Sequence, residues 1–231
     1  VSLKDAVAEW WRRYCEWVKG QGFAPSTAHH YLTRMRCVLN KAEKDGLLVL
    51  NPARNAHISG VRRAERVYLT KEELRSLKGC FYGESDIQRA FLFGCFCGLR
   101  YSDIKALRWE DIQEGRIVKR IVKTRKVEYL DLNSQAREML GERSSGLVFR
   151  LGGDMKRVEK ELGEWAGRAG IAKHITFHTS RHTFAVLMLS AGVDIYTLSR
   201  LLGHSSVTTT QIYADIVDAR RREAVEMFPV I

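Results

Sequence analysis

Hydrophobic residues recur at helical spacing along most of this chain, and one region shows the pattern of β-strands instead. That region comprises 115–122 and 127–132, whose composition predicts two strands joined by a short turn. We predict helices near 3–18, 25–45, 70–79, 84–97, 101–107, 134–140, 154–169, 178–191, 194–202, 206–213 and 215–227. The sequence therefore predicts a mainly α fold with a small β-hairpin or sheet.

A basic segment divides the chain. Residues 51–68 begin with a helix-breaking Asn-Pro pair and carry arginines without apolar periodicity. Thr70-Lys71-Glu72-Glu73 then supplies a capping box, and Leu69 with Leu74 supplies a hydrophobic staple, so a new domain is expected to begin there. The predicted organisation is a helical domain over 1–50, a basic linker over 51–68, and a second domain over 69–231 with a C-terminal tail at 215–231.

The charge balance points to a polyanionic partner. Lys and Arg number 38 against 27 Asp and Glu, which gives a net charge of +11. Nucleic acid is the simplest partner for such an excess. An anionic membrane is less favoured because no polybasic tail lies beside an apolar anchor. The net charge alone is also compatible with a basic protein that has no special partner.

Cysteine usage indicates a reducing compartment. The five cysteines are irregularly spaced, and the pair Cys95-x-Cys97 has no second pair that could complete a zinc site. No stretch approaches the length of a membrane span, and the N-terminus lacks a signal-peptide pattern. We therefore expect a cytoplasmic protein without a metal centre.

Five residues in three segments have the chemistry needed to attack a phosphodiester. His178 and Arg181 lie on one face of a predicted helix, and Arg100 adds a second arginine. His204 and Tyr213 follow near the end of the chain. Arginine binds phosphate oxygens through paired N–H groups, histidine exchanges protons near neutral pH, and a tyrosine hydroxyl can be a covalent nucleophile. Taken singly, each residue would more often be structural, so the prediction depends on the combination.

Their order and spacing resemble the tyrosine recombinase family, also called phage-type integrases. The resemblance covers nearly all of 69–228, and its boxes look most like integrases of bacterial mobile elements. It is carried by Gly98-Leu99-Arg100-Tyr101-Ser102-Asp103, His178-Thr179-Ser180-Arg181-His182-Thr183-Phe184-Ala185, and Leu202-Gly203-His204 followed by Tyr213. It implies a tyrosine-recombinase catalytic domain over 69–231. It also implies that 1–50 is part of the family's helical core-binding domain, which binds DNA, although we expect this segment to be too short for the whole of it.

The resemblance also implies a role for each residue. Arg100 and Arg181 correspond to the two arginines that hold the scissile phosphate. His178 corresponds to the proton-handling residue between them, and His204 to a residue that hydrogen-bonds the phosphate. Tyr213 corresponds to the nucleophile. No metal or cofactor is implied.

Two further positions follow from the same resemblance. Lys123, in the turn between the predicted strands, looks like the lysine that protonates the leaving 5′ oxygen. Lys126 lies three residues later and stays open as an alternative, because the sequence does not fix the turn. Asp103 matches an acidic position that supports the site without reacting.

The implied activity is site-specific DNA recombination through a covalent 3′-phosphotyrosyl intermediate, in integration or excision of a mobile element. The expected partners are double-stranded DNA and further copies of the chain, as a tetramer on two DNA sites in the cytoplasm, associated with the nucleoid. An accessory DNA-bending protein is left open, and no membrane is expected.

Two alternatives use the same fold. A type IB topoisomerase resembles this family in its Arg, Lys, Arg, His and Tyr site and would relax supercoils without a target sequence. The helical N-terminal domain and the residues around Tyr213 favour the recombinase. A DNA-binding regulator that has lost its chemistry is disfavoured, because every expected catalytic position is filled.

Overall fold

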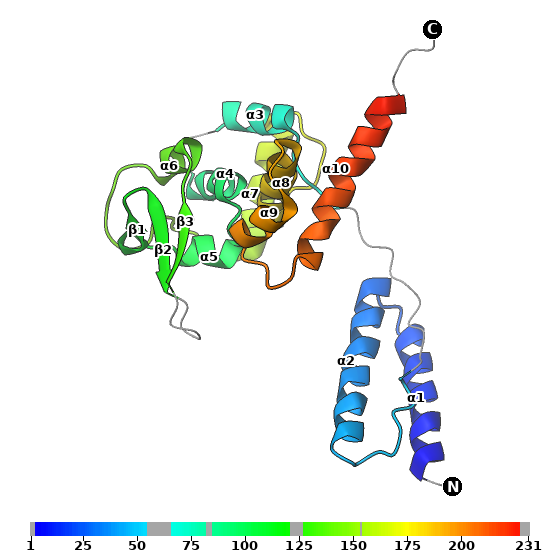
Figure 1. The fold of residues 1–231 in the computed structure, drawn as a ribbon. Helices are drawn as coiled ribbons and strands as arrows, with labels where there is room; N and C mark the ends of the chain where they lie inside the picture. The colour runs from blue at the N-terminus through cyan, green and yellow to red at the C-terminus, as the bar shows by residue number, and fades with distance from the viewer. Residues whose placement is uncertain (1–2, 55–65, 82–84, 121–126, 153, 227–231) are drawn as a thin grey trace. The chain divides into compact units, whose positions relative to one another are not determined.

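The computed structural model describes residues 3–54, 66–81, 85–120, 127–152 and 154–226. Helices dominate these residues and accompany one small sheet (Figure 1), so the predicted mainly α fold is confirmed. The chain divides into two compact units, Val1–Glu65 and Arg66–Ile231. In chain order the elements are α1 (Leu3–Gly20), α2 (Pro25–Lys44), α3 (Lys71–Gly79), α4 (Asp86–Cys97), α5 (Tyr101–Ala106), the 3₁₀ turn η1 (Trp109–Asp111), β1 (Ile112–Gln113), β2 (Arg116–Arg120), β3 (Val127–Asp131), α6 (Ser134–Leu140), α7 (Met155–Arg168), α8 (Phe177–Ser190), α9 (Ile195–Leu201) and α10 (Thr208–Glu226).

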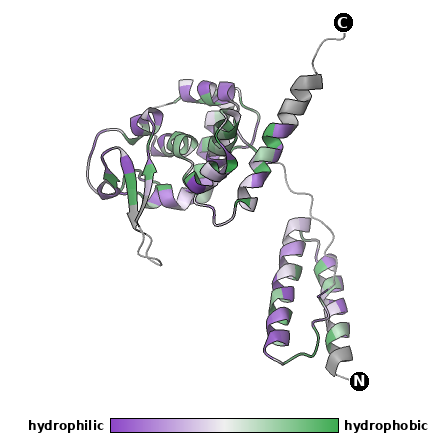
Figure 2. Cartoon of the chain, viewed as in Figure 1, coloured by the Kyte–Doolittle hydropathy of each residue, from purple (hydrophilic) through white to green (hydrophobic). Residues whose placement is uncertain are grey.

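The first unit is a helix pair with its own small core. Trp11 and Val18 of α1 pack with Leu32 and Leu39 of α2. Hydrophobic and hydrophilic residues are mixed along both helices (Figure 2), as expected for helices that bury one face. The Asn51 side chain closes the unit, since its Nδ2 donates to Asn40 and its Oδ1 accepts from the amide of Ala53.

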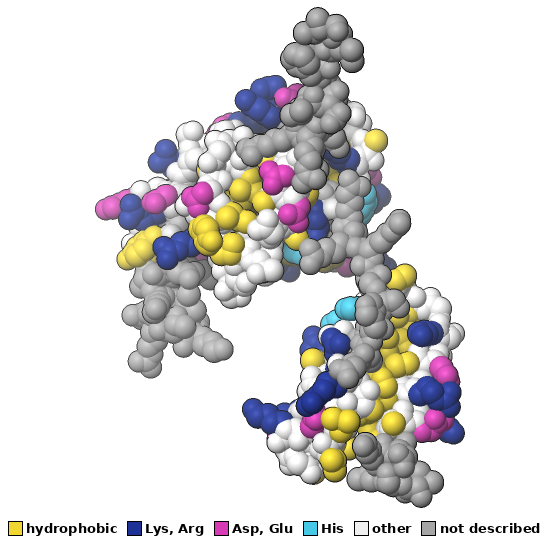
Figure 3. Space-filling view, turned by 45° about the vertical axis from the view of Figure 1, so that its right-hand side comes forward, with side chains coloured by type: hydrophobic (Ala, Val, Ile, Leu, Met, Phe, Trp, Pro, Cys, Tyr) yellow, Lys and Arg dark blue, Asp and Glu magenta, His cyan; other side chains and the backbone are white. Residues whose placement is uncertain are grey.

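Aromatic rings extend from that core onto the surface of the first unit. The Trp10 and Tyr14 rings stack with their centroids 5.3 Å apart, and Trp17 meets Phe23 edge-on. Figure 3 shows a stripe of hydrophobic side chains over this unit between charged ones. Among the described residues, Trp10 and Trp17 are about half exposed.

The second unit is built around α4. This helix is buried on all sides, because the sequence from Ile87 to Cys97 is apolar around its whole circumference except for Gln88 and Arg89. It packs against α5, α6, α7 and α8. A second cluster of buried residues joins α8, α9 and α10 and contains Phe184, Leu198 and Tyr213. The helices that carry the candidate residues are therefore fixed by burial.

The capping box that was predicted to open this unit is present. The Thr70 hydroxyl accepts from the Glu73 amide, and the Glu73 carboxylate accepts from the Thr70 amide. Leu69 and Leu74, the predicted staple, are both buried in the core. These contacts fix the start of α3 at Lys71, directly after the N-cap Thr70, and hold its first turn against the core.

The sheet has three antiparallel strands in the order β1-β2-β3. The predicted hairpin is β2 with β3, in the register Ile117↔Leu130. β1 was not predicted, because two residues are too few to show a period. It joins β2 through Glu114 and Gly115, both at positive φ, which is the geometry of a tight two-residue hairpin turn. The tip at 121–126 lies outside the described residues.

One helix prediction is wrong. We predicted separate helices at 206–213 and 215–227, but α10 runs unbroken from Thr208 to Glu226. The residue between the two predicted segments is Ala214, the best helix former, and neither glycine nor proline occurs in α10 to interrupt it. The C-terminal tail predicted from residue 215 is thus largely helical, and 227–231 lie outside the described residues.

A close approach of α4 to α8 gives the first testable expectation. A Cβ at Gly94 would lie 2.5 Å from Ser180 Oγ, and that hydroxyl is held by its hydrogen bond to the Phe177 carbonyl. Gly94→Ala should therefore destabilise the protein by about 1–3 kcal/mol, as overpacking does in cores. Gly163→Ala is the matched control, since Gly163 is an exposed helical position on α7 with open space around it. It should stabilise by up to about 1 kcal/mol. Urea unfolding measures both, and a neutral Gly94→Ala would contradict the packing.

Candidate active site

Arg181 joins the three sequence boxes at one point. It lies on α8 with only 6% of its surface exposed. Its Nη1 donates to the Gly98 carbonyl at 2.8 Å, and its Nη2 donates to the Leu202 carbonyl at 2.7 Å. A guanidinium carries five N–H donors, so these two bonds orient the group and leave donors for a ligand.

The two loops that supply the Gly98 and Leu202 carbonyls each have a glycine at the end of a helix. Gly98 ends α4 with φ 72°, and an added Cβ would also lie 2.5 Å from the Phe184 ring. Gly203 ends α9 with φ 61°. The Gly203 amide bonds Arg200 and the His204 amide bonds Ser199, which is the Schellman pattern. These left-handed turns bring the Arg100 and His204 segments toward Arg181.

Tyr213 is buried against the helix that carries Arg181. Its side chain is 3% exposed and belongs to the α8–α9–α10 core. The phenol oxygen lies 2.8 Å from Nδ1 of His182, and the two ring centroids are 5.6 Å apart. The Tyr213 oxygen therefore has a fixed position inside the second unit.

Burial and positive charge set the protonation of this pair. Burial raises the pKa of Tyr213, while the charges of Arg181 and Arg66 act in the opposite direction. Burial, the charge of Arg66, the neighbouring His178 and the charge of Arg181 lower the pKa of His182 to about 4. Near neutral pH the phenol therefore keeps its proton and the imidazole is uncharged.

Arg181 itself is affected by its surroundings. Burial and the charge of Arg100 lower the pKa of Arg181 to about 10, with Tyr213 and Asp103 opposing the shift. The group is still cationic at pH 7. Because the charge of Arg100 acts on Arg181, the site is electrostatically unfavourable until an anion enters it, which suits a phosphate ligand.

His204 is oriented by a threonine. Its Nδ1 lies 2.8 Å from the hydroxyl of Thr210, a fully buried residue of α10. Burial, Arg181 and Arg100 lower the pKa of His204. When the Thr210 hydroxyl donates to Nδ1, the proton of the neutral ring lies on Nε2, where it can be donated to a phosphate oxygen.

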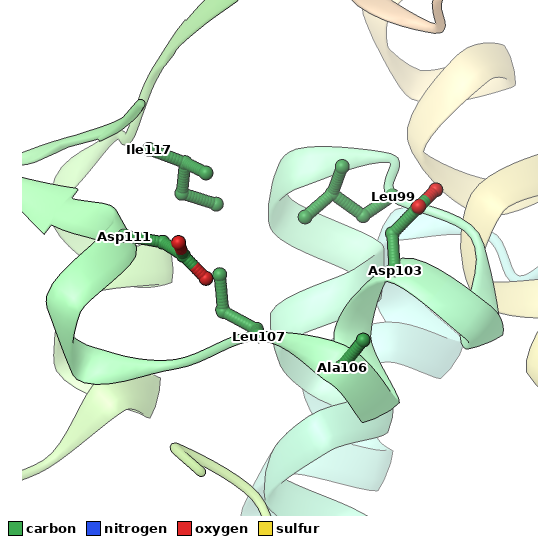
Figure 4. A pocket seen from close by; sticks show the side chains of 6 residues that line it. All are labelled: Leu99, Asp103, Ala106, Leu107, Asp111 and Ile117. Atoms are coloured by element: carbon green, nitrogen blue, oxygen red, sulfur yellow. The ribbon is translucent and has the colours of Figure 1, made fainter. Parts of the chain in front are cut away.

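Arg100 and Asp103 lie at the start of α5. Arg100 is the N-cap of that helix and is exposed, whereas Asp103 is partly buried one turn later. Figure 4 shows Asp103 at the rim of a small pocket with Leu99, Ala106, Leu107, Asp111 and Ile117. Apolar side chains and two carboxylates line this pocket, so it does not suit an anionic ligand. Asp103 instead supports the positive charge of Arg181.

Of the six residues predicted for the site, the structure brings five together. Arg100, Arg181, His204 and Tyr213 are linked by the hydrogen bonds and charge effects described above. His178 is exposed on α8, with its ring centroid 6.0 Å from that of His182. The sixth residue, Lys123, and its alternative Lys126 lie outside the described residues.

The sequence reasoning missed two residues of this site. His182 follows Arg181 directly and lies one turn after His178, so its position in the box was a usable signal. Arg66 was assigned to the basic linker, yet it belongs to the second unit and its charge acts on both His182 and Tyr213. Only the three-dimensional packing reveals that role.

Two other features of the described residues bear on function. No group of three or more metal-ligating side chains is found within the described parts of the chain. None of the helices seen there is both long enough and apolar enough to cross a bilayer.

Two family models cover most of the sequence. The Phage integrase family matches 67–220, and the Phage integrase SAM-like domain matches 1–58. The chain therefore belongs to the phage integrase family, which comprises the tyrosine-type site-specific DNA recombinases. The predicted family is confirmed.

Individual relatives agree with this assignment. A tyrosine recombinase of Thermosipho africanus is 28% identical over 230 residues, covering 90% of this chain and 78% of the relative. The tyrosine recombinase XerC of Chromobacterium violaceum is 29% identical over 231 residues, covering 92% of this chain and 77% of the relative. These relatives are recombinases, so the topoisomerase alternative is not favoured.

Solved structures share the fold. The XerH site-specific recombinase in a post-cleavage complex with difH substrate has a TM-score of 0.73 at 18% identity, covering 94% of this chain and 72% of that chain. A lambda integrase dimer bound to a COC′ core site has a TM-score of 0.65 at 18% identity, covering 92% of this chain and 81% of that chain.

Proposed function

We propose that the protein cleaves one strand of duplex DNA through attack of the Tyr213 phenol oxygen on a backbone phosphorus. The attack forms a 3′-phosphotyrosyl bond and releases a 5′ hydroxyl. A 5′ hydroxyl from a second duplex then displaces the tyrosine, so the strand is rejoined without another energy source. The main support is that the Tyr213 oxygen contacts His182 on α8, the same helix that carries Arg181.

The two arginines are proposed to stabilise the transition state. Attack places additional negative charge on the non-bridging oxygens of the phosphate, and preorganised cations favour that state. Arg181 is already oriented by the Gly98 and Leu202 carbonyls, so little reorganisation is needed. Arg100 is exposed at the start of α5 and can approach the phosphate from the solvent side.

The remaining roles concern protons and hydrogen bonds. His204, oriented by Thr210, is proposed to donate Nε2–H to a phosphate oxygen. His178 is proposed as the proton-handling residue between the arginines. Lys123, or Lys126, is proposed to protonate the leaving 5′ oxygen, because an alkoxide leaves poorly without an acid.

Double-stranded DNA is the proposed substrate. The net charge of +11 fits a polyanion, and solved relatives such as the XerH and lambda integrase structures contain DNA. A full exchange needs two duplexes and is proposed to use four copies of the chain, in integration or excision of a mobile element. The site of action is proposed to be the nucleoid in the cytoplasm, with an accessory DNA-bending protein as a further candidate partner.

Sequencing of DNA recovered from covalent adducts tests the proposal. DNA that stays attached to the protein after denaturation should contain one recurrent short sequence, joined through its 3′ phosphate. A plasmid with two copies of that sequence should recombine when the protein is added. Relaxation of any supercoiled plasmid, with adducts scattered over unrelated sequences, would instead indicate a topoisomerase.

A further inference from the structure

The imidazole in contact with the Tyr213 oxygen is that of His182. Nδ1 lies 2.8 Å from the phenol oxygen, within hydrogen-bond distance. His182 lies on α8 and is half-buried on the side that contacts Tyr213 of α10, whereas His178, one turn earlier on α8, is exposed. The histidine that the family resemblance selects and the histidine that the structure places on the nucleophile are therefore different residues.

We propose that His182 accepts the proton of the Tyr213 phenol during strand cleavage, and that it becomes able to do so only when a DNA phosphate occupies the site. This inference rests on the proposed role of Tyr213 as the nucleophile. It deepens that proposal by moving the acceptance of the phenol proton from His178 to His182.

The charges around His182 explain why DNA is required. Arg181 and His178 face it from α8, Arg66 faces it from the segment before α3, and Tyr213 faces it from α10. Without DNA, burial, the charges of Arg66 and Arg181 and the neighbouring His178 hold the pKa of His182 at about 4, so the ring cannot retain a proton taken from the phenol. A phosphate between the arginines adds negative charge beside the ring. That charge offsets the cations and makes the imidazole more basic.

The proton and the bonds balance through the step. The phenol proton moves from Oη to Nδ1 of His182, and the oxygen forms a bond to phosphorus. The bond from phosphorus to the 5′ oxygen breaks, and that oxygen takes a proton from the acid assigned to Lys123, which lies outside the described residues. In the rejoining step the attacking 5′ hydroxyl loses its proton to that lysine. His182 then returns its proton to the departing Tyr213 oxygen.

Two substitutions separate proton acceptance from positioning. His182→Asn places an amide atom near the position of Nδ1, so it can hold the phenol by a hydrogen bond but cannot take a proton near neutral pH. His182→Phe replaces the imidazole by a phenyl ring, which has no nitrogen. Each should lower single-turnover cleavage of a nicked DNA substrate by about 10²–10⁴-fold, the usual contribution of a general base, with DNA affinity unchanged. If His182→Phe fails to fold, His182→Asn alone decides the matter.

The pH profile gives the sharper readout. Without a base, cleavage depends on the fraction of ionised phenol, so the deficit of His182→Asn should shrink about tenfold per pH unit from about pH 6 to about pH 9. A merely structural role gives a deficit that is independent of pH. His178→Asn is the matched variant on the same helix, and its deficit should not shrink as rising pH ionises the phenol, because the phenol proton is assigned to His182. A wild-type rate or a pH-independent deficit in His182→Asn would overturn the proposal, as would a pH-dependent deficit in His178→Asn alone.

A sulfur-containing substrate distinguishes the two ends of the reaction. When sulfur replaces the bridging 5′ oxygen, the leaving thiolate needs no acid. The deficit of His182→Asn should persist on this substrate, and its disappearance would mean that His182 serves the leaving group instead.

Failure of this inference differs visibly from failure of the proposed function. If adducts depend on Tyr213 but His182→Asn cleaves like the wild type, only the role of His182 is rejected. If the wild type forms no adducts, or forms them without Tyr213, the proposed function and this inference both fail.

Discussion

Tyr213→Phe should abolish covalent protein–DNA adducts and leave DNA binding unchanged. The substitution removes one oxygen, the proposed attacking atom, and keeps the ring that packs with Phe184 and Leu198 in the α8–α9–α10 core. Loss of the hydrogen bond to His182 should cost about 0.5–1.5 kcal/mol of stability, too little to unfold a domain. Adducts are measured on denaturing gels with a nicked substrate, and binding is measured by gel shift.

Tyr196→Phe is the matched control for that experiment. Tyr196 lies on α9 and is 69% exposed, so its hydroxyl should contribute nothing to adduct formation. Adducts that survive in Tyr213→Phe at the wild-type level would rule out Tyr213 as the nucleophile. Adducts lost equally in both variants would point to a general defect.

Arg181→Ala should impair both cleavage and stability. Loss of one preorganised donor to a transition-state oxyanion typically costs about 10²–10³ in rate, and a comparable loss of cleavage is expected here. The variant also removes the buried partner of the Gly98 and Leu202 carbonyls, which should cost about 1–3 kcal/mol for each carbonyl left unsatisfied. Single-turnover cleavage and thermal unfolding measure the two effects.

Arg100→Ala is the comparison that separates them. Removal of Arg100 should reduce cleavage by a similar factor, because it is the second proposed phosphate ligand. The unfolding temperature should stay close to that of the wild type, because Arg100 is exposed. Both variants should lose far more cleavage than DNA affinity. Equal losses of binding and cleavage would mean that the arginines only hold the duplex.

Local signals allowed much of the fold to be predicted. The capping box at Thr70 and Glu73, the apolar circumference of α4, and the paired strands β2 and β3 are each encoded within a few neighbouring residues. The division of α10 into two helices was wrong, because a change from apolar to charged composition was interpreted as a boundary. Composition alone does not end a helix when the intervening residue is Ala214 and no breaker is present.

The candidate site was predictable to the extent that its residues stand in sequence boxes. The contact between His182 and Tyr213 joins residues 31 positions apart and depends on how α8 packs against α10. The effect of Arg66 on the same pair depends on the path of the segment before α3. No local pattern encodes either relation, so both needed the structure.

The anchoring of Arg181 between two backbone carbonyls affects how inactive descendants of such a protein should be interpreted. A lineage that abandons chemistry but keeps its architecture can replace Tyr213 by Phe, or discard the exposed Arg100, at small structural cost, whereas discarding Arg181 also loosens two loops. Retention of this arginine in a degenerate copy is consequently weak evidence of activity, and the pair Tyr213 and Arg100 is the more informative marker.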